Sequence, residues 1–289
     1  MTHTTIIGLG AMGAGMAGNL HRAGMLAGAW NRSPERGKAA ADTHGFALAD
    51  NLAQAVTGSQ LIITCVSADA DLLEVTEQLL PVLQSGQVVL DTSTVSSDTA
   101  QRVAESYAKQ GVGFIDGPVS GGREGAEKGT MVMMAGGEEE TLQQIMPALE
   151  VITSRVVHMG PVGSGQATKA VNQIMAAGIN QAVTEALAFG QANGLDMHKV
   201  IDVVGGGAAG NWFLDHRGKT MCEGTFEPGF RVALHHKDLK ICQSMAAKHE
   251  VSLPVIEMTL VHYERLMEQQ HGDEDISALF RLKKQLFEN

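Results

Sequence analysis

The sequence of 289 residues is poor in cysteine, in aromatic side chains and in positive charge. Its three cysteines are far apart and odd in number, which argues against a disulfide framework and indicates a reducing compartment, so we expect a cytoplasmic protein. A net charge of −11 argues against nucleic-acid binding, because such surfaces need clustered lysine and arginine. No apolar run reaches the roughly 18 residues of a membrane span, and we expect neither a membrane segment nor a signal peptide.

Short apolar runs alternate with helical patterns in the first half of the chain. The expected strands are rich in β-branched residues or bounded by Gly, Pro or Asp, and cover residues 4–8, 26–30, 61–66, 88–91, 113–116, 130–135 and 151–158. The expected helices between them cover residues 11–23, 35–43, 69–83, 96–110 and 138–149. This alternation predicts an α/β domain of the Rossmann type with a mostly parallel sheet.

After residue 165 only helical patterns occur. The expected helices cover residues 166–193, 197–204, 211–222, 236–249, 254–269 and 276–287. We therefore expect an α/β domain over residues 1–162 and an all-helical domain over residues 163–289, linked by the long helix.

The segment Gly8-Leu9-Gly10-Ala11-Met12-Gly13 follows the first expected strand and begins the first expected helix. In this position it reads as a dinucleotide-binding fingerprint. The first Gly makes the tight turn, the second lets the backbone approach the pyrophosphate, and the third lets helix and strand pack closely. The helix N-terminus adds N–H groups for the phosphates. A plain glycine-rich turn is the alternative, and the place directly after a strand disfavours it.

The end of the second expected strand indicates which nucleotide binds. NAD-binding proteins carry an acidic residue about 20 positions after the fingerprint, whereas this chain has Asn31-Arg32-Ser33. Arg32 and Ser33 can bind a 2′-phosphate, so we expect NADP(H) to be preferred, with NAD(H) possible. The alternative is that Arg32 stacks on the adenine or lies in solvent. Val66 and Ser67, after another strand, should also border the cofactor.

Five segments together resemble the β-hydroxyacid dehydrogenases, which include 3-hydroxyisobutyrate dehydrogenase, tartronate semialdehyde reductase and the glyoxylate/succinic semialdehyde reductases. They are residues 8–13, 91–94, 116–122, 163–173 and 237–239. They occur in the order typical of the family and extend over almost the whole chain. The resemblance implies a helical domain for substrate binding and dimerisation, and a homo-oligomer, either a dimer or a tetramer.

Lys169, near the start of the long helix, is the expected catalytic residue. Carbonyl reduction needs a proton on oxygen, which a positioned lysine can donate while the cofactor supplies the hydride, and the resemblance implies the same role. A surface lysine is the alternative. Asn172 lies on the same helical face and is expected to bind substrate or hold the ammonium. Some members carry this Asn one position later, where this chain has Gln173, so the choice between the two stays open.

The other expected site residues follow strands or lie in the helical domain. Ser120-Gly121-Gly122 can form a nest of N–H groups, and the resemblance implies that it binds the substrate carboxylate. The resemblance also implies that Thr94 contacts the nicotinamide ribose, that Ser93 lies near the carboxamide or substrate, and that Lys237 reaches the nicotinamide side. The alternatives are a helix cap by Thr94 or Ser96 and an ion pair between Lys237 and Asp238.

These features favour an NADP(H)-dependent oxidoreductase that interconverts a small carboxylated aldehyde, such as succinic semialdehyde, glyoxylate or tartronate semialdehyde, and its hydroxy acid. An NAD(P)-dependent dehydrogenase of 3-hydroxyisobutyrate, serine or another 3-hydroxy acid is the second hypothesis. A non-catalytic nucleotide-binding module is the third, and Lys169 argues against it. The expected partner is a small anionic substrate. We expect no metal site, because the adjacent His235 and His236 do not share a helical face.

Overall fold

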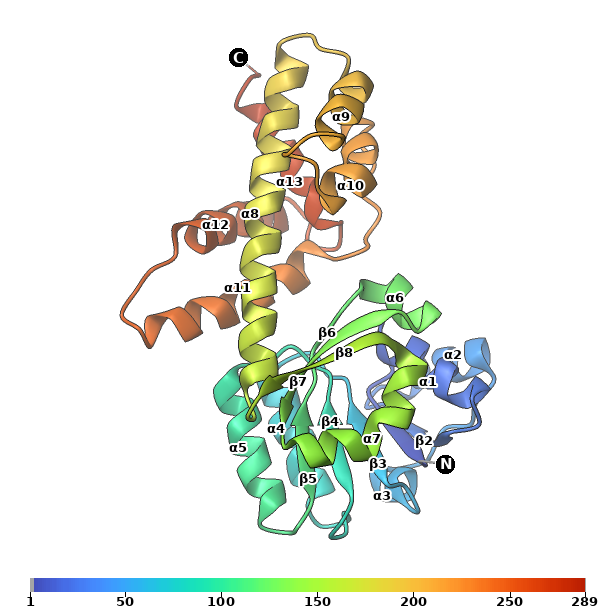
Figure 1. Ribbon diagram of the computed structural model, residues 1–289. Coiled ribbons are helices and arrows are strands. Elements are labelled where there is room, and N and C mark those ends of the chain that lie inside the picture. Colours follow the sequence, from blue (N-terminus) through green and yellow to red (C-terminus); the bar gives the residue numbers. More distant parts are fainter. Residues whose placement is uncertain (1–2, 289) are drawn as a thin grey trace. The chain divides into compact units, whose positions relative to one another are not determined.

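The computed structural model describes residues 3–288, and the chain divides into two compact units, Met1–Lys169 and Ala170–Asn289. The first unit contains a mostly parallel sheet covered by helices, and the second is all-helical (Figure 1). The predicted fold class is therefore confirmed. The boundary between the two units, after Lys169, falls within the long helix α8 (Ser164–Ala192).

One sheet of eight strands forms the centre of the first unit. The strands are β1 (Thr4–Ile7), β2 (Leu26–Trp30), β3 (Leu61–Thr64), β4 (Val88–Asp91), β5 (Gly113–Asp116), β6 (Val119–Ser120), β7 (Met131–Gly137) and β8 (Thr153–Gly160). Their order is β2-β1-β3-β4-β5-β7-β6, with β8 beside β7. Strands β1 to β5 pair in parallel, and β7 runs antiparallel to both β5 and β6. From β1 the chain first adds β2 on one side and then adds β3, β4 and β5 on the other. In α/β sheets, ligands bind at such a switch point, beyond the carboxyl ends of the strands.

Helices cover both faces of this sheet. One face carries α1 (Gly13–Arg22), α2 (Pro34–His44), α6 (Gly122–Lys128) and α7 (Glu139–Ile152), and the other carries α3 (Leu52–Val56), α4 (Asp69–Leu79) and α5 (Ser97–Ala108). Successive strand residues point to opposite faces, so Ile6 packs in the first of these cores and Ile7 in the second. Because both faces of the sheet are covered, the central strands β3 and β4 are buried at every position and apolar at all but the last, as their sequence indicates.

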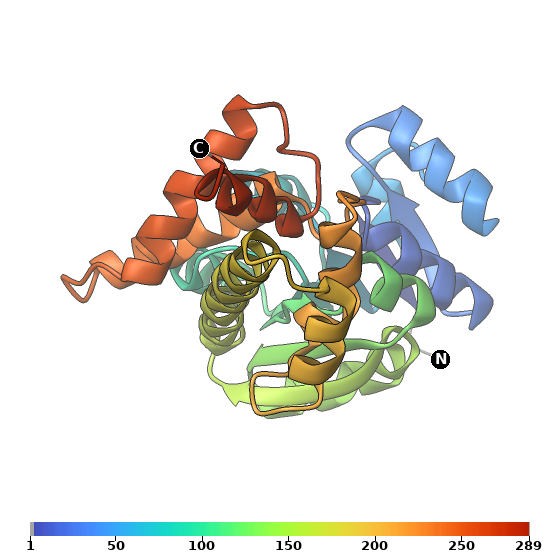
Figure 2. The same cartoon turned by 90° about the horizontal axis from the view of Figure 1, so that it is seen from above.

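The second unit packs its helices against α8. They are α9 (Met197–Gly205), α10 (Trp212–Cys222), α11 (Val232–Ala247), α12 (Pro254–Glu268), the short 3-10 helix η1 (Ile276–Ala278) and α13 (Leu279–Gln285). Figure 2 shows α8 nearly end-on, with α9 and α10 on one side and α11 to α13 on the other. Its core is apolar but encloses a polar chain in which the Tyr263 hydroxyl bonds His235 Nδ1 at 2.9 Å and Asn180 Nδ2 at 3.0 Å. Within residues 3–288, no helix is long and apolar enough to span a membrane.

Several boundaries differ from the sequence predictions. The short elements α3, β6 and α6 were not predicted, because five, two and seven residues carry too little periodicity to reveal an element. The helix predicted over residues 69–83 ends at Leu79, since Pro81 has no N–H with which to continue the helical hydrogen bonds. The strand predicted from residue 151 begins at Thr153, because α7 continues to Ile152. The helix predicted over residues 276–287 is η1 followed by α13, and α11 begins at Val232 rather than at residue 236.

Candidate functional site

The three glycines of the fingerprint serve different purposes in the structure. Gly8 has a φ of +96°, and a Cβ there would lie 2.2 Å from the carbonyl oxygen of Cys65. A Cβ on Gly13 would lie 1.9 Å from the carbonyl oxygen of Gly8, so α1 and β1 need a glycine to pack. A Cβ on Gly10 would meet no protein atom within 4 Å. The packing of the protein therefore does not require Gly10, whereas a ligand that approaches the backbone does, and this cradle fits a dinucleotide pyrophosphate.

The segment after β2 lies against the fingerprint loop. The Leu9 N–H donates to Asn31 Oδ1 at 2.8 Å, and Asn31 Nδ2 donates to the Ser33 carbonyl, also at 2.8 Å. Asn31 therefore holds the fingerprint loop in place through the Leu9 N–H. Its predicted contact with the cofactor stays a prediction. Arg32 is 67% exposed, and its Nη1 donates to Asp71 at 2.7 Å and to Glu74 at 3.2 Å. An arginine is always charged at neutral pH, and the hydrogen bond to Asp71 raises the pKa of the Arg32 guanidinium further.

The ends of β3 and β4 are joined by a buried serine. Ser93 accepts the Val66 N–H at 2.8 Å, and its hydroxyl donates to Asp91 Oδ1 at 2.6 Å. Ser93 is only 1% exposed, so its hydroxyl organises the segment that includes Val66 and Ser67. Its predicted contact with the substrate stays a prediction. Ser96 rather than Thr94 caps α5, because Ser96 Oγ accepts the Thr99 N–H at 3.2 Å.

Lys169 is a buried lysine at the start of α8, not a surface residue. It is 8% exposed, and its Nζ donates to the carbonyl oxygen of Val119 at 2.9 Å. Val119 directly precedes Ser120, and Gly121 and Gly122 follow with φ values of +131° and +61°. The ammonium therefore lies beside the predicted nest, in which Gly121 is exposed and Ser120 and Gly122 are half-buried. This pairing of a cation with backbone N–H groups suits a small anionic ligand.

Two buried side chains that sequence analysis did not single out hold the first turn of α8. Asp116 accepts the Gly163 N–H at 2.7 Å and the Gln166 N–H at 2.9 Å. The Gln166 side chain accepts the Val95 N–H at 3.1 Å and donates to the Ser93 carbonyl at 2.9 Å. The helix that carries Lys169 is thus tied both to β5 and to the segment after β4. The sequence signal that could have identified Asp116 is its position at the carboxyl end of an expected strand.

Asn172 and Lys237 belong to the second unit, where they join one chain of hydrogen bonds. Asn172 Nδ2 donates to Gln173 Oε1 at 2.8 Å, and Gln173 Nε2 donates to Asp238 Oδ2 at 2.6 Å. Lys237 Nζ lies 2.8 Å from Asp238 Oδ1, which is the ion pair weighed above. Gln173 is 2% exposed and uses both ends of its amide, whereas Asn172 is half-buried. Of the two amides, that of Gln173 is therefore fully engaged within the protein, and the predicted contact of Asn172 with a substrate stays a prediction.

Comparison with known proteins agrees with this architecture. Residues 3–160 match the family model described as the NAD binding domain of 6-phosphogluconate dehydrogenase. Residues 163–283 match the model described as NAD-binding of NADP-dependent 3-hydroxyisobutyrate dehydrogenase. The chain belongs to the β-hydroxyacid dehydrogenase family.

The relatives of this β-hydroxyacid dehydrogenase extend over nearly its whole length. It is 32% identical to the 2-(hydroxymethyl)glutarate dehydrogenase of Eubacterium barkeri, over 97% of this chain and 94% of that one. It is 31% identical to the NAD-dependent L-serine dehydrogenase of Pseudomonas aeruginosa, over 98% of both chains. A solved structure of Mycobacterium tuberculosis 3-hydroxyisobutyrate dehydrogenase with L-serine superposes with a TM-score of 0.88 at 29% identity, over 98% of this chain and 99% of that one. This β-hydroxyacid dehydrogenase is an NAD(P)-dependent oxidoreductase.

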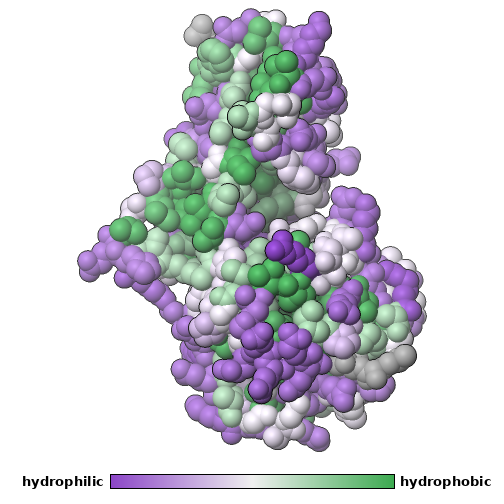
Figure 3. All heavy atoms as spheres, viewed as in Figure 1, coloured by the Kyte–Doolittle hydropathy of each residue, from purple (hydrophilic) through white to green (hydrophobic). Residues whose placement is uncertain are grey.

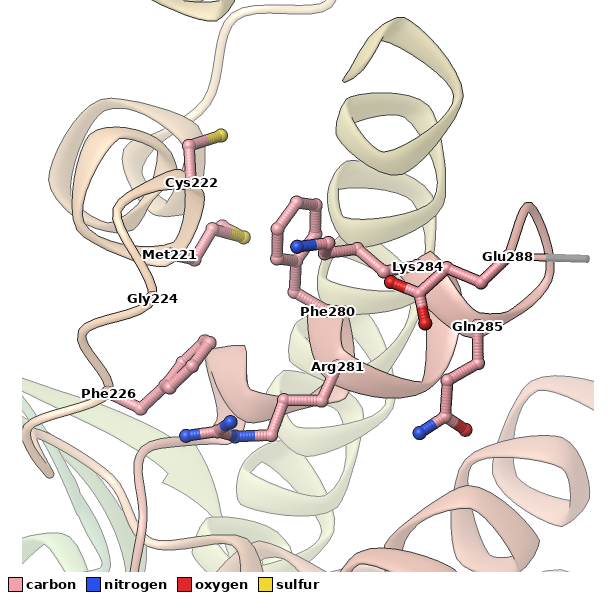
Figure 4. A pocket seen from close by; sticks show the side chains of 9 residues that line it. All are labelled: Met221, Cys222, Gly224, Phe226, Phe280, Arg281, Lys284, Gln285 and Glu288. Atoms are coloured by element: carbon pink, nitrogen blue, oxygen red, sulfur yellow. The ribbon is translucent and has the colours of Figure 1, made fainter. Parts of the chain in front are cut away.

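The second unit of the dehydrogenase contains a cavity of about 240 Å³ (Figure 4). Met221, Phe226 and Phe280 supply apolar walls, and Arg281 and Lys284 lie at its side. Arg281 binds Glu274 through two hydrogen bonds of 2.9 and 3.0 Å and stacks on Phe226, so its charge is already satisfied. None of the predicted site residues lines this cavity.

Proposed function

We propose that this β-hydroxyacid dehydrogenase interconverts a small carboxylated aldehyde and its hydroxy acid with NADP(H), and that Lys169 exchanges the proton. The observation that carries the proposal is the buried Lys169 ammonium, 2.9 Å from the Val119 carbonyl and next to the nest of residues 120–122. A buried cation beside a turn with two glycines of positive φ supports binding of an anion whose carbonyl is to be protonated.

In the proposed reaction the cofactor supplies the hydride and the protein supplies the proton. Bound NADP(H) supplies the hydride to the carbonyl carbon, or accepts it in the reverse direction. Lys169 donates a proton to the carbonyl oxygen and stabilises the negative charge that develops there; in oxidation it takes the proton back. The N–H groups of Gly121 and Gly122, with the Ser120 hydroxyl, hold the carboxylate. Asn172 hydrogen-bonds the reacting oxygen or the ammonium.

Preference for NADP(H) over NAD(H) is part of the proposal. The segment 31–33 has a permanent cation and no carboxylate, which supports binding of a 2′-phosphate. Arg32→Ala should therefore weaken the binding of NADPH at least about tenfold, as the loss of a charge-assisted hydrogen bond implies, while the binding of NADH should stay nearly unchanged. Equal losses for both nucleotides, measured by titration calorimetry, would refute the 2′-phosphate contact.

A second candidate is oxidation of a 3-hydroxy acid, and the relatives named for L-serine and 3-hydroxyisobutyrate favour it. The two functions share Lys169 and the nest, so they differ in substrate and direction only. Steady-state rates with succinic semialdehyde, glyoxylate and tartronate semialdehyde plus NADPH, and with 3-hydroxyisobutyrate and L-serine plus NADP, separate them. The substrate with the highest kcat/KM identifies the function.

Substitution of Lys169 tests whether the site is catalytic as proposed. Lys169→Ala should lower kcat by about 100-fold or more, because a general acid typically contributes that much. Lys199→Ala is the control, since the Lys199 side chain is 85% exposed. NADPH affinity should stay within about twofold in both variants, because the proton donor is needed for the chemical step and not for nucleotide binding. Turnover of Lys169→Ala within about threefold of wild type would contradict the assignment.

We further propose that a second copy of the chain covers one face of the second unit. Val171, Met175 and Ile179 form an exposed apolar stripe on α8, and α12 adds Val255, Met258 and Val261. The two helices are neighbours, since Gln181 of α8 donates to Thr259 of α12 at 3.1 Å. Figure 3 shows hydrophobic residues gathered over these helices, and exposed patches of this kind mark interfaces. Cys65, Cys222 and Cys242 form no disulfide, which supports a reducing compartment, and we propose the cytoplasm.

A further inference from the structure

Arg32 forms an ion-pair cluster with two carboxylates of α4, which we call the arginine strap (Arg32, Asp71 and Glu74). Nη1 of Arg32 lies 2.7 Å from Asp71 Oδ1 and 3.2 Å from Glu74 Oε2. Asp71 and Glu74 are three residues apart on α4 and so share one helical face. The Asp71 side chain is 21% exposed, whereas that of Arg32 is 67% exposed, so the carboxylate is the better-fixed partner.

The topology of the sheet places the strap across the fingerprint loop. Strand β1 lies between β2 and β3, and Ile7 at its end pairs with both Trp30 and Thr64. Because the three strands are parallel, the segments that follow them leave the sheet at the same edge. The fingerprint follows β1, Arg32 follows β2, and Asp71 lies beyond β3. The ion pair therefore joins the two segments that flank the fingerprint, across the mouth of the cradle that fits the dinucleotide.

The strap has a net charge of −1, although it contains the one residue proposed to bind a 2′-phosphate. That phosphate carries a charge of about −1.5 to −2 at neutral pH. To accept it, Arg32 must either leave Asp71 and Glu74 or hold the phosphate within a few ångströms of both carboxylates. Either event weakens binding of the phosphorylated nucleotide. NAD(H) has a hydroxyl at this position and does not compete for the guanidinium.

We propose that Asp71 and Glu74 are specificity-determining residues that oppose the 2′-phosphate and so reduce the preference for NADP(H) over NAD(H). This inference rests on the proposed contact between Arg32 and that phosphate. The two acids set the size of the preference, and Arg32 sets its direction. The strap thereby leaves the protein able to use both nucleotides.

Neutral variants of the two acids test the proposal by direct binding. Asp71→Asn and Asp71→Asn/Glu74→Gln are compared with Glu77→Gln, which removes one charge from an exposed residue of the same helix. The probes are 2′,5′-ADP and 5′-AMP, which differ by the phosphate alone, followed by NADPH and NADH. Calorimetry gives each Kd at low salt and again at high salt. Thermal melting confirms that every variant is folded.

The proposal expects 2′,5′-ADP and NADPH to bind about three- to tenfold more tightly to Asp71→Asn, and more tightly still to the double variant, as expected for removing one or two like charges near a surface. 5′-AMP and NADH should change by less than about twofold, and the gain should shrink at high salt, because exposed charges are screened. Glu77→Gln should change neither pair. Unchanged or weaker NADPH binding, or equal gains for NADH, would overturn the role of the acids.

The Arg32→Ala variant separates this inference from the proposed cofactor preference. If Arg32→Ala weakens NADPH selectively but the acid variants have no selective effect, the inference fails and the NADP(H) preference stands. If Arg32→Ala affects both nucleotides equally, the preference itself fails and the inference falls with it. Selective effects of opposite sign in Arg32→Ala and Asp71→Asn support both.

Discussion

Stability should depend on pH through Asp116, the buried carboxyl group that holds the start of α8. Asp116 has no exposed surface, and burial raises its pKa to about 7, although the N–H groups of Gly163 and Gln166 partly offset this effect. In the unfolded chain an aspartate has a pKa of about 3.9. Between these two values the folded protein retains a proton that the unfolded chain has lost. Folding stability therefore falls as pH rises through this window, and the loss is complete above pH 7.

The size of the effect follows from the difference in pKa. Each unit corresponds to about 1.4 kcal/mol, so a difference of about three units corresponds to about 4 kcal/mol over the whole window. Between pH 5 and pH 7 the expected loss is about 2–3 kcal/mol. Asp116→Asn is the matched control because it keeps the shape and cannot titrate. Its amide loses one of the two N–H bonds, a cost that does not vary with pH.

Urea unfolding of wild type and Asp116→Asn at pH 5, 6, 7 and 8, followed by circular dichroism, measures this dependence. All other titrating groups are common to both proteins, so they cancel in the difference. The advantage of wild type over the variant should shrink steadily from pH 5 to 7 and then level off. A difference that is constant over this range, or one that grows with pH, would refute the argument that burial controls this carboxyl.

The remaining predictions concern the fingerprint, the Gln166 side chain at the start of α8 and the exposed apolar face of α8 and α12. Gly10→Ala should keep wild-type stability but weaken the binding of NADPH about tenfold or more. Gly13→Ala should instead lower Tm, because its Cβ would lie 1.9 Å from a backbone oxygen. Equal losses of Tm in the two variants would contradict this reasoning. Gln166→Ala should lower kcat about tenfold with NADPH affinity retained, since small misplacements of a catalytic group are costly; an unchanged kcat would exclude a positioning role. Met175→Glu should shift the protein to a smaller assembly in sedimentation experiments, whereas a monomeric wild type would rule out the second copy.

Local patterns predicted the elements that carry the cofactor signal. The β1 run and the glycines at positions 8, 10 and 13 interact within a few residues of one another, so their spacing alone indicates a turn and a helix start. The apolar residues of β1, β3 and β4 likewise indicated strands that are buried on both faces of a sheet. Lys169 was identified through its surrounding motif, and the structure then showed that the residue is buried.

Contacts between distant parts of the sequence were beyond such patterns. Asp116 reaches residues 47 and 50 positions away, Gln166 reaches 71 and 73 positions, and Arg32 reaches Asp71 across 39 positions. No periodicity records such pairs, because each depends on which strands lie side by side and which loops leave the same edge of the sheet. The sequence by itself thus determined the two kinds of domain, the glycine fingerprint and the lysine proposed as proton donor. Only the tertiary structure decided what holds that lysine and which charges face Arg32, since those contacts exist only after the chain has folded.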